Sequence, residues 1–340
     1  MWWVMHISWM RIVLTHRHLG GDLFLLTGTL SRASLDIPGV LRLSVRVPSK
    51  PIPTFLVFLC IFSAAANALV VHSQHESAAL SRFLMWCPGF AALSTCLLLR
   101  IPLGTLGWRW PATRFLTLAY FLPLIYATPV YLFTWLTIRD AFALAGFEAT
   151  MAGTYGLGAS PILGTFGVAF PLLLTITVIG TATWALGEEL GWRGFLFPRL
   201  RERLGFHGAC LVSGVLWAVW HYPGLLWADY NAGTNVVFAI GCFTVSIISM
   251  AYIMGYLRTY SGSIWPCVLL HATHNTFVQG LFDPLTAKVG WAKYITTEFG
   301  AVLAAAEVGA AIIIISIGHH GGGLQMTGVA VPRDNAKHKT

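Results

Sequence analysis

The chain has 340 residues, of which 56% are hydrophobic and only 10% are charged, and its mean hydropathy is +0.70. Because an ordinary soluble domain has roughly 25% charged residues, this composition excludes two soluble domains and predicts a single integral-membrane domain. The formal net charge of +8 does not indicate a nucleic-acid partner. The basic residues lie in the gaps between apolar runs, where the positive-inside rule accounts for them.

Apolar runs of about 20 residues are long enough for a helix to cross the hydrocarbon core of a bilayer. The chain contains about eight such runs, and Pro-Gly pairs in the second and fifth are expected to interrupt those two helices. The predicted spans are residues 54–71, 83–99, 115–136, 166–186, 209–227, 236–257, 264–281 and 299–317. The predicted fold class is all-α, a polytopic membrane bundle of about eight transmembrane helices.

The charges of the connecting segments alternate along the chain. The segment before the first span, residues 100–114, residues 193–203, Arg258 and the C-terminal tail are net positive, and the segments between them are neutral or slightly negative. An even number of spans places both termini on one side, and the positive-inside rule makes that side the cytoplasm. We therefore expect a multi-pass integral membrane protein with both termini cytoplasmic, in the plasma membrane if the source is prokaryotic.

The two ends of the chain differ from the span-rich part. Residues 1–52 are basic, mixed in composition and without the pattern of a signal peptide or a span, so they predict a weakly structured extension. Residues 319–340 contain a glycine run followed by polar and basic residues, which is typical of a disordered tail. Residues 53–318 remain as one transmembrane domain, and its polar motifs fall within residues 166–281.

Ionisable side chains inside a span cost at least about 2.5 to 3.5 kcal/mol each on insertion scales, so each is a functional candidate. Three clusters of this kind lie on neighbouring predicted spans, which allows them to converge in one cavity. The clusters are Glu188, Glu189 and Arg193; Trp217 and His221; and His271, His274 and Asn275.

Helical spacing distinguishes the two adjacent glutamates. Neighbouring helical residues point about 100° apart, whereas residues four apart share a face. Glu189 is therefore expected to pair with Arg193, an arrangement that is equally typical of a structural ion pair. Glu188 has no such cation beside it, so it is the candidate general base.

The histidines divide in a similar way. His271 and Asn275 are four residues apart, and an imidazole and a carboxamide one turn apart can jointly face a developing negative charge. His274 borders the same face and is interpreted as a bystander. His221 precedes a proline, so an interfacial histidine of a broken helix is its alternative interpretation.

Two common hydrolase motifs are missing from the sequence. The only near match to HExxH is His75-Glu76, which has Ala79 where the second histidine would stand. No GxSxG pattern occurs, so a serine nucleophile elbow is excluded. If the protein is a hydrolase, its catalytic groups are therefore expected to be glutamate and histidine side chains.

The order and spacing of the three motifs resemble those of the CPBP family of intramembrane endopeptidases. This family includes the type II CAAX prenyl proteases and the Abi-type proteins linked to bacteriocin self-immunity. The resemblance covers roughly residues 166–281, about a third of the chain. One difference is that the second motif begins with Trp217 where the family usually has Phe, from which we expect a change in packing without loss of activity.

The resemblance implies a role for each motif residue. Glu188 and His221 would activate a water for attack on a peptide carbonyl, and His271 and Asn275 would stabilise the oxyanion. Glu189 would orient the site together with Arg193.

The resemblance leaves the cofactor open. It is either absent or a divalent metal such as zinc, for which Glu188, His221 and His271 are the candidate ligands. The expected partners are a peptide or protein substrate, whether or not it is lipid-modified, and membrane lipid, with no nucleic acid.

Two other functions compete with a peptidase active in CAAX-type processing or bacteriocin self-immunity. Buried glutamate and histidine residues can relay protons in a proton-coupled transporter, and interrupted spans are common there. Against a transporter, the sequence has no second copy of the Glu-Glu motif and no evident inverted repeat. A catalytically silent membrane scaffold or immunity protein that keeps the cluster for stability is the third hypothesis.

Overall fold

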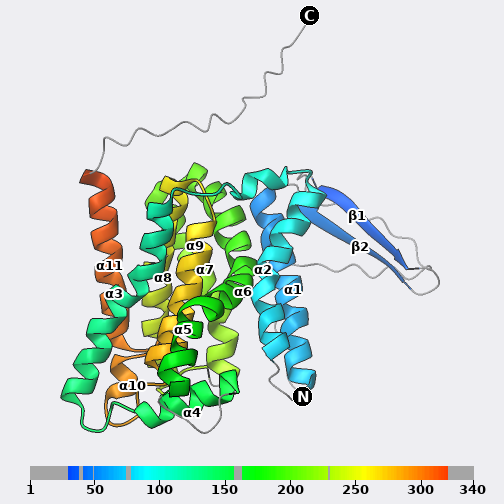
Figure 1. The fold of residues 1–340 in the computed structure, drawn as a ribbon. Coiled ribbons are helices and arrows are strands. Elements are labelled where there is room, and N and C mark those ends of the chain that lie inside the picture. Colours follow the sequence, from blue (N-terminus) through cyan, green and yellow to red (C-terminus); the bar gives the residue numbers. More distant parts are fainter. Residues whose placement is uncertain are drawn as a thin grey trace, which may run out of the picture.

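The structure is a computed structural model that describes residues 30–37, 41–48, 50–73, 78–156, 163–228 and 230–320. Most of these residues form a bundle of long helices that lie side by side (Figure 1). The α-helices are α1 (Pro51–Ser73), α2 (Ala78–Leu98), α3 (Thr113–Thr137), α4 (Leu144–Tyr155), α5 (Phe170–Leu172), α6 (Val178–Glu189), α7 (Phe197–Trp227), α8 (Val236–Ser261), α9 (Trp265–His274), α10 (Ala292–Ile295) and α11 (Ala301–His320). A 3₁₀ turn, η1 (Leu103–Leu106), and four π-helical segments, η2 (Leu163–Ala169), η3 (Leu173–Thr177), η4 (Leu190–Leu196) and η5 (Asn275–Phe282), complete the helical structure.

The predicted all-α membrane bundle is confirmed, and each predicted apolar run lies on helical structure. Five helical tracts of the described residues are long and apolar enough to cross a membrane. One of them is the 64-residue tract Gly164–Trp227, and the apolar part of α2 is shorter, Arg82–Leu98. The number of eight spans and the cytoplasmic termini stay predictions.

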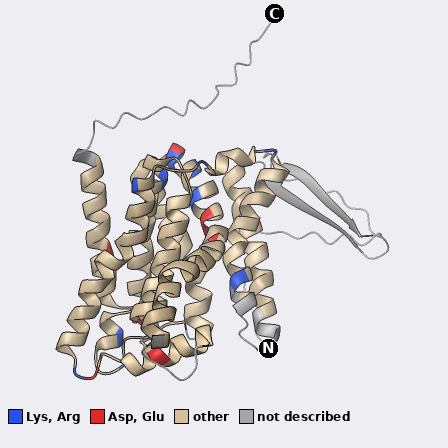
Figure 2. Ribbon diagram, viewed as in Figure 1, with Lys and Arg blue, Asp and Glu red and all other residues tan. Residues whose placement is uncertain are grey.

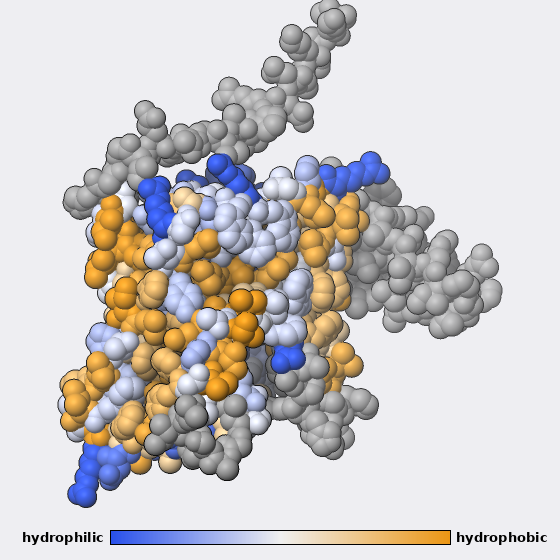
Figure 3. Space-filling model, viewed as in Figure 1, coloured by the Kyte–Doolittle hydropathy of each residue, from blue (hydrophilic) through white to orange (hydrophobic). Residues whose placement is uncertain are grey.

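Charge and hydropathy are distributed as in a membrane protein. Most charged residues lie at the two ends of the bundle, and few lie along its middle (Figure 2). On the face shown in Figure 3, hydrophobic side chains cover much of the surface between those ends. The lateral surface is therefore suited to contact with lipid tails.

The expected interruptions at the two Pro-Gly pairs are wrong. Pro88 lies inside α2 and Pro223 lies inside α7, and both helices continue past the proline. The break in α7 is instead at Gly205, whose φ of 70° and ψ of −176° are not helical. Glycine tolerates this conformation because it has no Cβ, so the kink precedes the apolar part of α7.

The N-terminal extension contains a two-stranded antiparallel hairpin that the sequence analysis did not anticipate. Strand β1 (Leu30–Ile37) pairs with β2 (Leu41–Pro48), in a register from Leu30 opposite Pro48 to Ile37 opposite Leu41. Apolar and polar residues alternate along β2, which is the period of a strand and not of a span. The predicted disordered tail from residue 321 onward lies outside the described residues.

Glycines bring α2 and α6 into close contact beside the two glutamates. A Cβ added at Gly187 would lie 2.7 Å from the Cα of Trp86, and one at Gly89 would lie 2.7 Å from the carbonyl oxygen of Gly187. Small residues allow two helix backbones to approach in this way. This close contact of α2 with α6 therefore lies one residue before Glu188.

Candidate active site

The two glutamates are the last residues of α6, directly before the π-helical segment η4. Glu188, Glu189 and Arg193 are only 1%, 0% and 1% exposed, so three ionisable side chains are buried within six residues. Burying a charge is costly unless it is paired or hydrogen-bonded. Short π-helical segments occur frequently at functional sites, and η4 carries Arg193.

Glu189 contacts two cationic or potentially cationic side chains through one oxygen. As the spacing predicted, Arg193 Nη1 donates to Glu189 Oε1 over 3.0 Å. His271 Nδ1 lies 2.9 Å from the same oxygen. An ionised carboxylate only accepts hydrogen bonds, so His271 carries a proton on Nδ1 and presents Nε2 to its other side.

Glu188 has a different partner. Its Oε2 accepts a hydrogen bond from Trp217 Nε1 over 2.6 Å. Among the residues that the structure describes, no cation forms an ion pair with Glu188. The two neighbouring carboxylates therefore differ as their helical spacing predicted.

Trp217 is the central contact of the cluster, and sequence reasoning missed this role. The Arg193 guanidinium carbon lies 4.0 Å from the centroid of the indole ring. The ring centroids of His271 and His221 lie 5.5 Å and 6.0 Å from that of Trp217. One indole thus contacts residues from all three sequence motifs, and the only signal in the sequence was a tryptophan at a position where the family usually has phenylalanine.

His221 has a fixed orientation on α7. Its Nδ1 lies 2.9 Å from the carbonyl oxygen of Trp217. Because a carbonyl oxygen only accepts, Nδ1 carries the proton, and Nε2 of the neutral ring is free to accept one. The ring is half-buried between Trp220 and Phe243, with centroid distances of 4.7 Å and 5.2 Å. His221 is therefore an ordered acceptor next to Trp217.

Asn275 is the first residue of η5, which continues α9 without a break. It lies one turn beyond His271 and is half-buried. The helix thus places the carboxamide near His271, as the spacing predicted. The contacts described above bring Glu188, Glu189, Arg193, His221 and His271 together, and Asn275 joins them through its position on the helix.

The predicted metal ligands do not form a metal site in this structure. Within the described part of the chain, no group of three His, Cys, Asp or Glu side chains is arranged to hold a metal ion. Trp217 occupies one oxygen of Glu188, and Glu189 occupies one nitrogen of His271. These contacts use one oxygen of Glu188 and one nitrogen of His271, so each side chain keeps a second atom that could act as a ligand.

His274, which the sequence analysis interpreted as a bystander, belongs to a second buried network. Its Nδ1 lies 2.6 Å from the Tyr126 hydroxyl and 3.6 Å from Glu307 Oε1. Its Nε2 lies 3.6 Å from Glu298 Oε1. His274 therefore faces carboxylates that lie far from the glutamate pair in the sequence.

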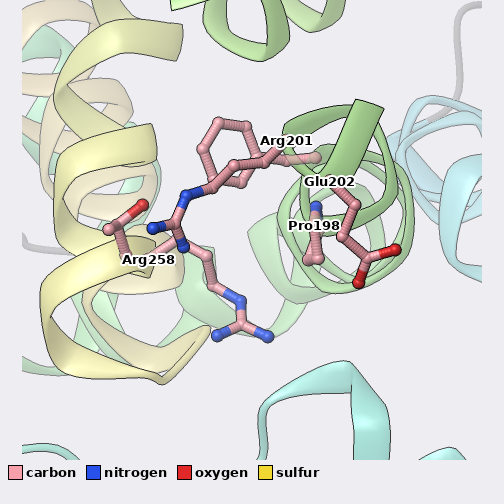
Figure 4. A pocket seen from close by; sticks show the side chains of 6 residues that line it. Pro198, Arg201, Glu202 and Arg258 are labelled. Carbon is pink, nitrogen blue, oxygen red and sulfur yellow. The ribbon is translucent and has the colours of Figure 1, made fainter. Parts of the chain in front are cut away.

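A pocket of about 320 Å³ lies between α7 and the end of α8 (Figure 4). It connects to the cluster through Arg258, whose Nε donates to the backbone oxygen of Arg193 over 3.0 Å. Its lining contains none of the predicted catalytic residues. The lining residues are Phe197, Pro198, Arg201, Glu202, Arg258 and Thr259.

Comparisons with known proteins match this part of the chain. Residues 168–277 match the family model described as type II CAAX prenyl endopeptidase Rce1-like. The chain is also similar to the CAAX prenyl protease 2 of Methanococcus maripaludis, with 39% identity over 56 residues. That alignment covers 16% of this chain and 17% of the relative. Residues 168–277 therefore match the CPBP, or CAAX protease, family, which confirms the resemblance found in the sequence.

Proposed function

We propose that the protein is an intramembrane endopeptidase that hydrolyses a peptide bond through a water activated by glutamate and histidine. The observation that carries the proposal is the meeting of Glu188, Arg193, His221 and His271 around the indole of Trp217. This cluster is buried inside a helical bundle with an apolar surface, in the segment that matches a protease family.

His221 and Glu188 are suited to activating the water. The free Nε2 of His221 can accept a proton, and the second oxygen of Glu188 is not the one that Trp217 binds. The water oxygen attacks the carbonyl carbon, and its proton passes to this pair. The same proton then goes to the leaving amine as the C–N bond breaks, so the enzyme returns to its starting state.

His271 and Asn275 are suited to stabilising the oxyanion. With Nδ1 directed at Glu189, a protonated His271 can donate from Nε2, and the Asn275 amide offers a second N–H. Glu189 fixes the ring orientation of His271 and neutralises part of its charge. Arg193 holds Glu189 in place from the adjacent turn.

Glu188→Gln tests this proposal. It keeps the shape of the side chain and an acceptor for Trp217 but removes the basic carboxylate. We expect peptide cleavage by the purified protein to fall by at least about 100-fold, the usual contribution of a general base. The exposed Glu202→Gln is the matched control. Unchanged cleavage in folded Glu188→Gln contradicts the mechanism, and proton-coupled flux in proteoliposomes that survives this change and His221→Ala supports a transporter instead.

We favour water activation without a metal, because an asparagine beside a histidine suits oxyanion binding better than zinc ligation. Protein purified without added zinc should then keep its activity after dialysis against a chelator. Activity that disappears on chelation and returns with one equivalent of zinc contradicts this part of the proposal.

The finer proposal for the substrate is CAAX-type processing. It rests on the names of the family model and of the archaeal relative, both of which describe CAAX prenyl proteases. Cleavage of a prenylated peptide ending in a CAAX sequence, compared with the same peptide without the prenyl group, tests it. Equal cleavage of both peptides argues against selection by the lipid and leaves a general or immunity-related peptidase.

A further inference from the structure

Glu298 is a buried carboxylate outside the segment that matches the family model. It lies in the turn between α10 and α11 and is 8% exposed. The residues of this turn, 296–300, are all buried. Connecting segments usually run over the surface, so a buried turn that carries an acid calls for a specific role.

The turn holds Glu298 in place with a strained backbone. Thr297 has a φ of 68°, a conformation that β-branched residues rarely adopt and that occurs preferentially at functional sites. The Thr297 N–H donates to the Tyr131 hydroxyl over 3.1 Å, and the Phe299 N–H donates to Thr297 Oγ1 over 3.2 Å. These hydrogen bonds support the strained residue directly before Glu298.

Glu298 contacts three side chains from two separate parts of the chain. Tyr230 lies after the end of α7, and its hydroxyl donates to Glu298 Oε2 over 2.6 Å. Gln279 Nε2 on η5 donates to Oε1, and His274 Nε2 on α9 lies 3.6 Å from that oxygen. Burial acts to raise the pKa of Glu298, but the contacts with His274, Tyr230 and Gln279 lower it to about 2, so the group is ionised at neutral pH.

Two of these contacts, those with Gln279 and Tyr230, lead to proposed catalytic residues. Gln279 is one helical turn beyond Asn275 on η5. The Tyr230 ring packs against Phe243 at a centroid distance of 6.3 Å, and Phe243 lies 5.2 Å from the His221 ring. Glu298 therefore connects the helix that carries Asn275 to the residues that pack on His221.

We propose that Glu298 is a positioning residue that fixes the helix bearing Asn275 relative to His221, the two sides of the candidate active site. This inference rests on the proposed function. Misplacing a catalytic group by about 1 Å can cost on the order of 100-fold in rate, so a single anchor between two such elements has a measurable effect.

Glu298→Gln tests the anchor, with Glu307→Gln as the matched control. Both carboxylates are buried and lie 3.6 Å from His274. Within the described part of the chain, Gln279 and Tyr230 form hydrogen bonds with Glu298 and none with Glu307. We expect Glu298→Gln to lower kcat by on the order of 10-fold to 100-fold with KM within about twofold. Amide hydrogen exchange in residues 275–282 should accelerate by at least about threefold. Glu307→Gln should change neither quantity.

The two readouts separate this inference from the proposed function. Unchanged exchange and unchanged kcat in Glu298→Gln overturn the positioning role. Faster exchange in a protein whose wild type cleaves no peptide supports the anchor and contradicts the peptidase. Tyr230→Phe should reproduce part of the effect, and its combination with Glu298→Gln should be less than additive because both remove one contact.

The pocket between α7 and α8 carries a second, independent inference. Arg201 and Arg258 extend into it from the two helices, whereas the carboxylate of Glu202 points away from both guanidinium groups (Figure 4). Among the described residues, neither arginine forms an ion pair with a carboxylate. Thr259 also lines the pocket, and its buried hydroxyl has no hydrogen-bond partner within the described chain.

We infer that this pocket binds a phosphate group, from a lipid headgroup or from free phosphate. Two guanidinium groups match a phosphate, because its several oxygens accept charge-assisted hydrogen bonds from such donors. The pocket lies in a stretch of net positive charge, where the positive-inside rule predicts the cytoplasmic side. Anionic lipid phosphates are concentrated at that surface.

Thermal unfolding of the detergent-solubilised protein with inorganic phosphate, at constant ionic strength, tests the site. We expect a saturable rise in Tm for the wild type and for the control Arg203→Gln, a neighbouring exposed arginine outside the pocket. In Arg201→Gln the apparent Kd for phosphate should rise by about tenfold, because one charge-assisted contact is lost. A Tm that rises without saturation, or that rises equally in the wild type and in Arg201→Gln, contradicts the proposed site.

Short-chain phosphatidic acid, compared with the matching diacylglycerol, distinguishes the source of the phosphate. Tighter binding of the phospholipid than of inorganic phosphate identifies a headgroup site. Equal binding of the two identifies a site for free phosphate.

Discussion

At the scale of single residues, the two adjacent glutamates differ in their partners, and this difference supports the separate roles proposed for them. Glu189 contacts Arg193 and His271, whereas Glu188 accepts a hydrogen bond from the indole of Trp217. A carboxylate with two strong partners is suited to fixing the positions of those side chains. A carboxylate with one neutral donor keeps an oxygen available for chemistry.

Replacing Glu189 should therefore affect stability more than replacing Glu188. Glu189→Gln leaves the buried Arg193 guanidinium without its counter-charge, and breaking a buried pair costs about 3 to 5 kcal/mol. Glu188→Gln removes no ion pair and should cost less than about 1 kcal/mol. Denaturant unfolding in detergent measures both, and equal losses of stability contradict the assignment.

Trp217 gives a second residue-scale prediction. Trp217→Phe restores the residue usual in the family and keeps an aromatic ring beside Arg193, but it deletes the donor to Glu188. Hydrogen bonds to charged groups contribute about 1.5 to 3 kcal/mol, so we expect kcat/KM to fall by on the order of 10-fold with little change in Tm. Unchanged kcat/KM supports the expectation from sequence that this difference affects packing alone.

At the scale of elements, the contact of α2 with α6 sets where the glutamate pair lies. Gly187→Ala would place a Cβ against the Trp86 backbone, which cannot move as a flexible side chain does. We expect a loss of about 1 to 3 kcal/mol from overpacking. Gly180→Ala is the matched control, because Gly180 is on the same helix with no atom within 4 Å of the added Cβ. Thermal unfolding of both variants measures this loss. If Gly187→Ala is as stable as Gly180→Ala or more stable, the close contact is contradicted.

The segment between η5 and α11 gives a pH-dependent prediction. Burial raises the pKa of the Asp283 carboxyl to about 7, although the Tyr131 hydroxyl that donates to it over 2.5 Å acts in the opposite direction. Between about pH 4 and 7 the folded protein keeps a proton that the unfolded chain has lost. The free energy of unfolding should therefore fall as the pH rises through this window and level off above it.

Asp283→Asn should remove that part of the pH dependence, because the amide does not titrate. Thermal unfolding in detergent at about pH 5, 6 and 7.5 compares the slopes of the two proteins. A slope in Asp283→Asn equal to that of the wild type contradicts the raised pKa of Asp283.

At the scale of the whole molecule, the chain is a helical membrane bundle with one compact polar cluster inside it. The cluster contains groups from α6, η4, α7 and α9, and the Glu298 turn joins it from the end of the bundle. The apolar lateral surface and the polar interior together fit hydrolysis of a substrate that reaches the site from the membrane. The family match covers the segment that carries the cluster, whereas the Glu298 turn lies outside it.

The sequence by itself determined the apolar runs, the membrane class and the identity of the motif residues. These properties depend on hydropathy and on the four-residue spacing of a helix, both of which are local. The Glu189–Arg193 contact is an example, because its two residues are four apart. The pairing of β1 with β2 was not predicted, because an alternating strand pattern differs from the long apolar runs that mark membrane spans.

Only the tertiary structure decided which distant groups meet. Trp217 donates to a residue 29 positions away, His271 contacts one 82 positions away, and Tyr230 binds Glu298 across 68 positions. No local pattern encodes such contacts, because they depend on how whole helices pack and on side-chain direction. For the same reason the prolines in α2 and α7 did not interrupt their helices, since neighbouring helices can support the local backbone.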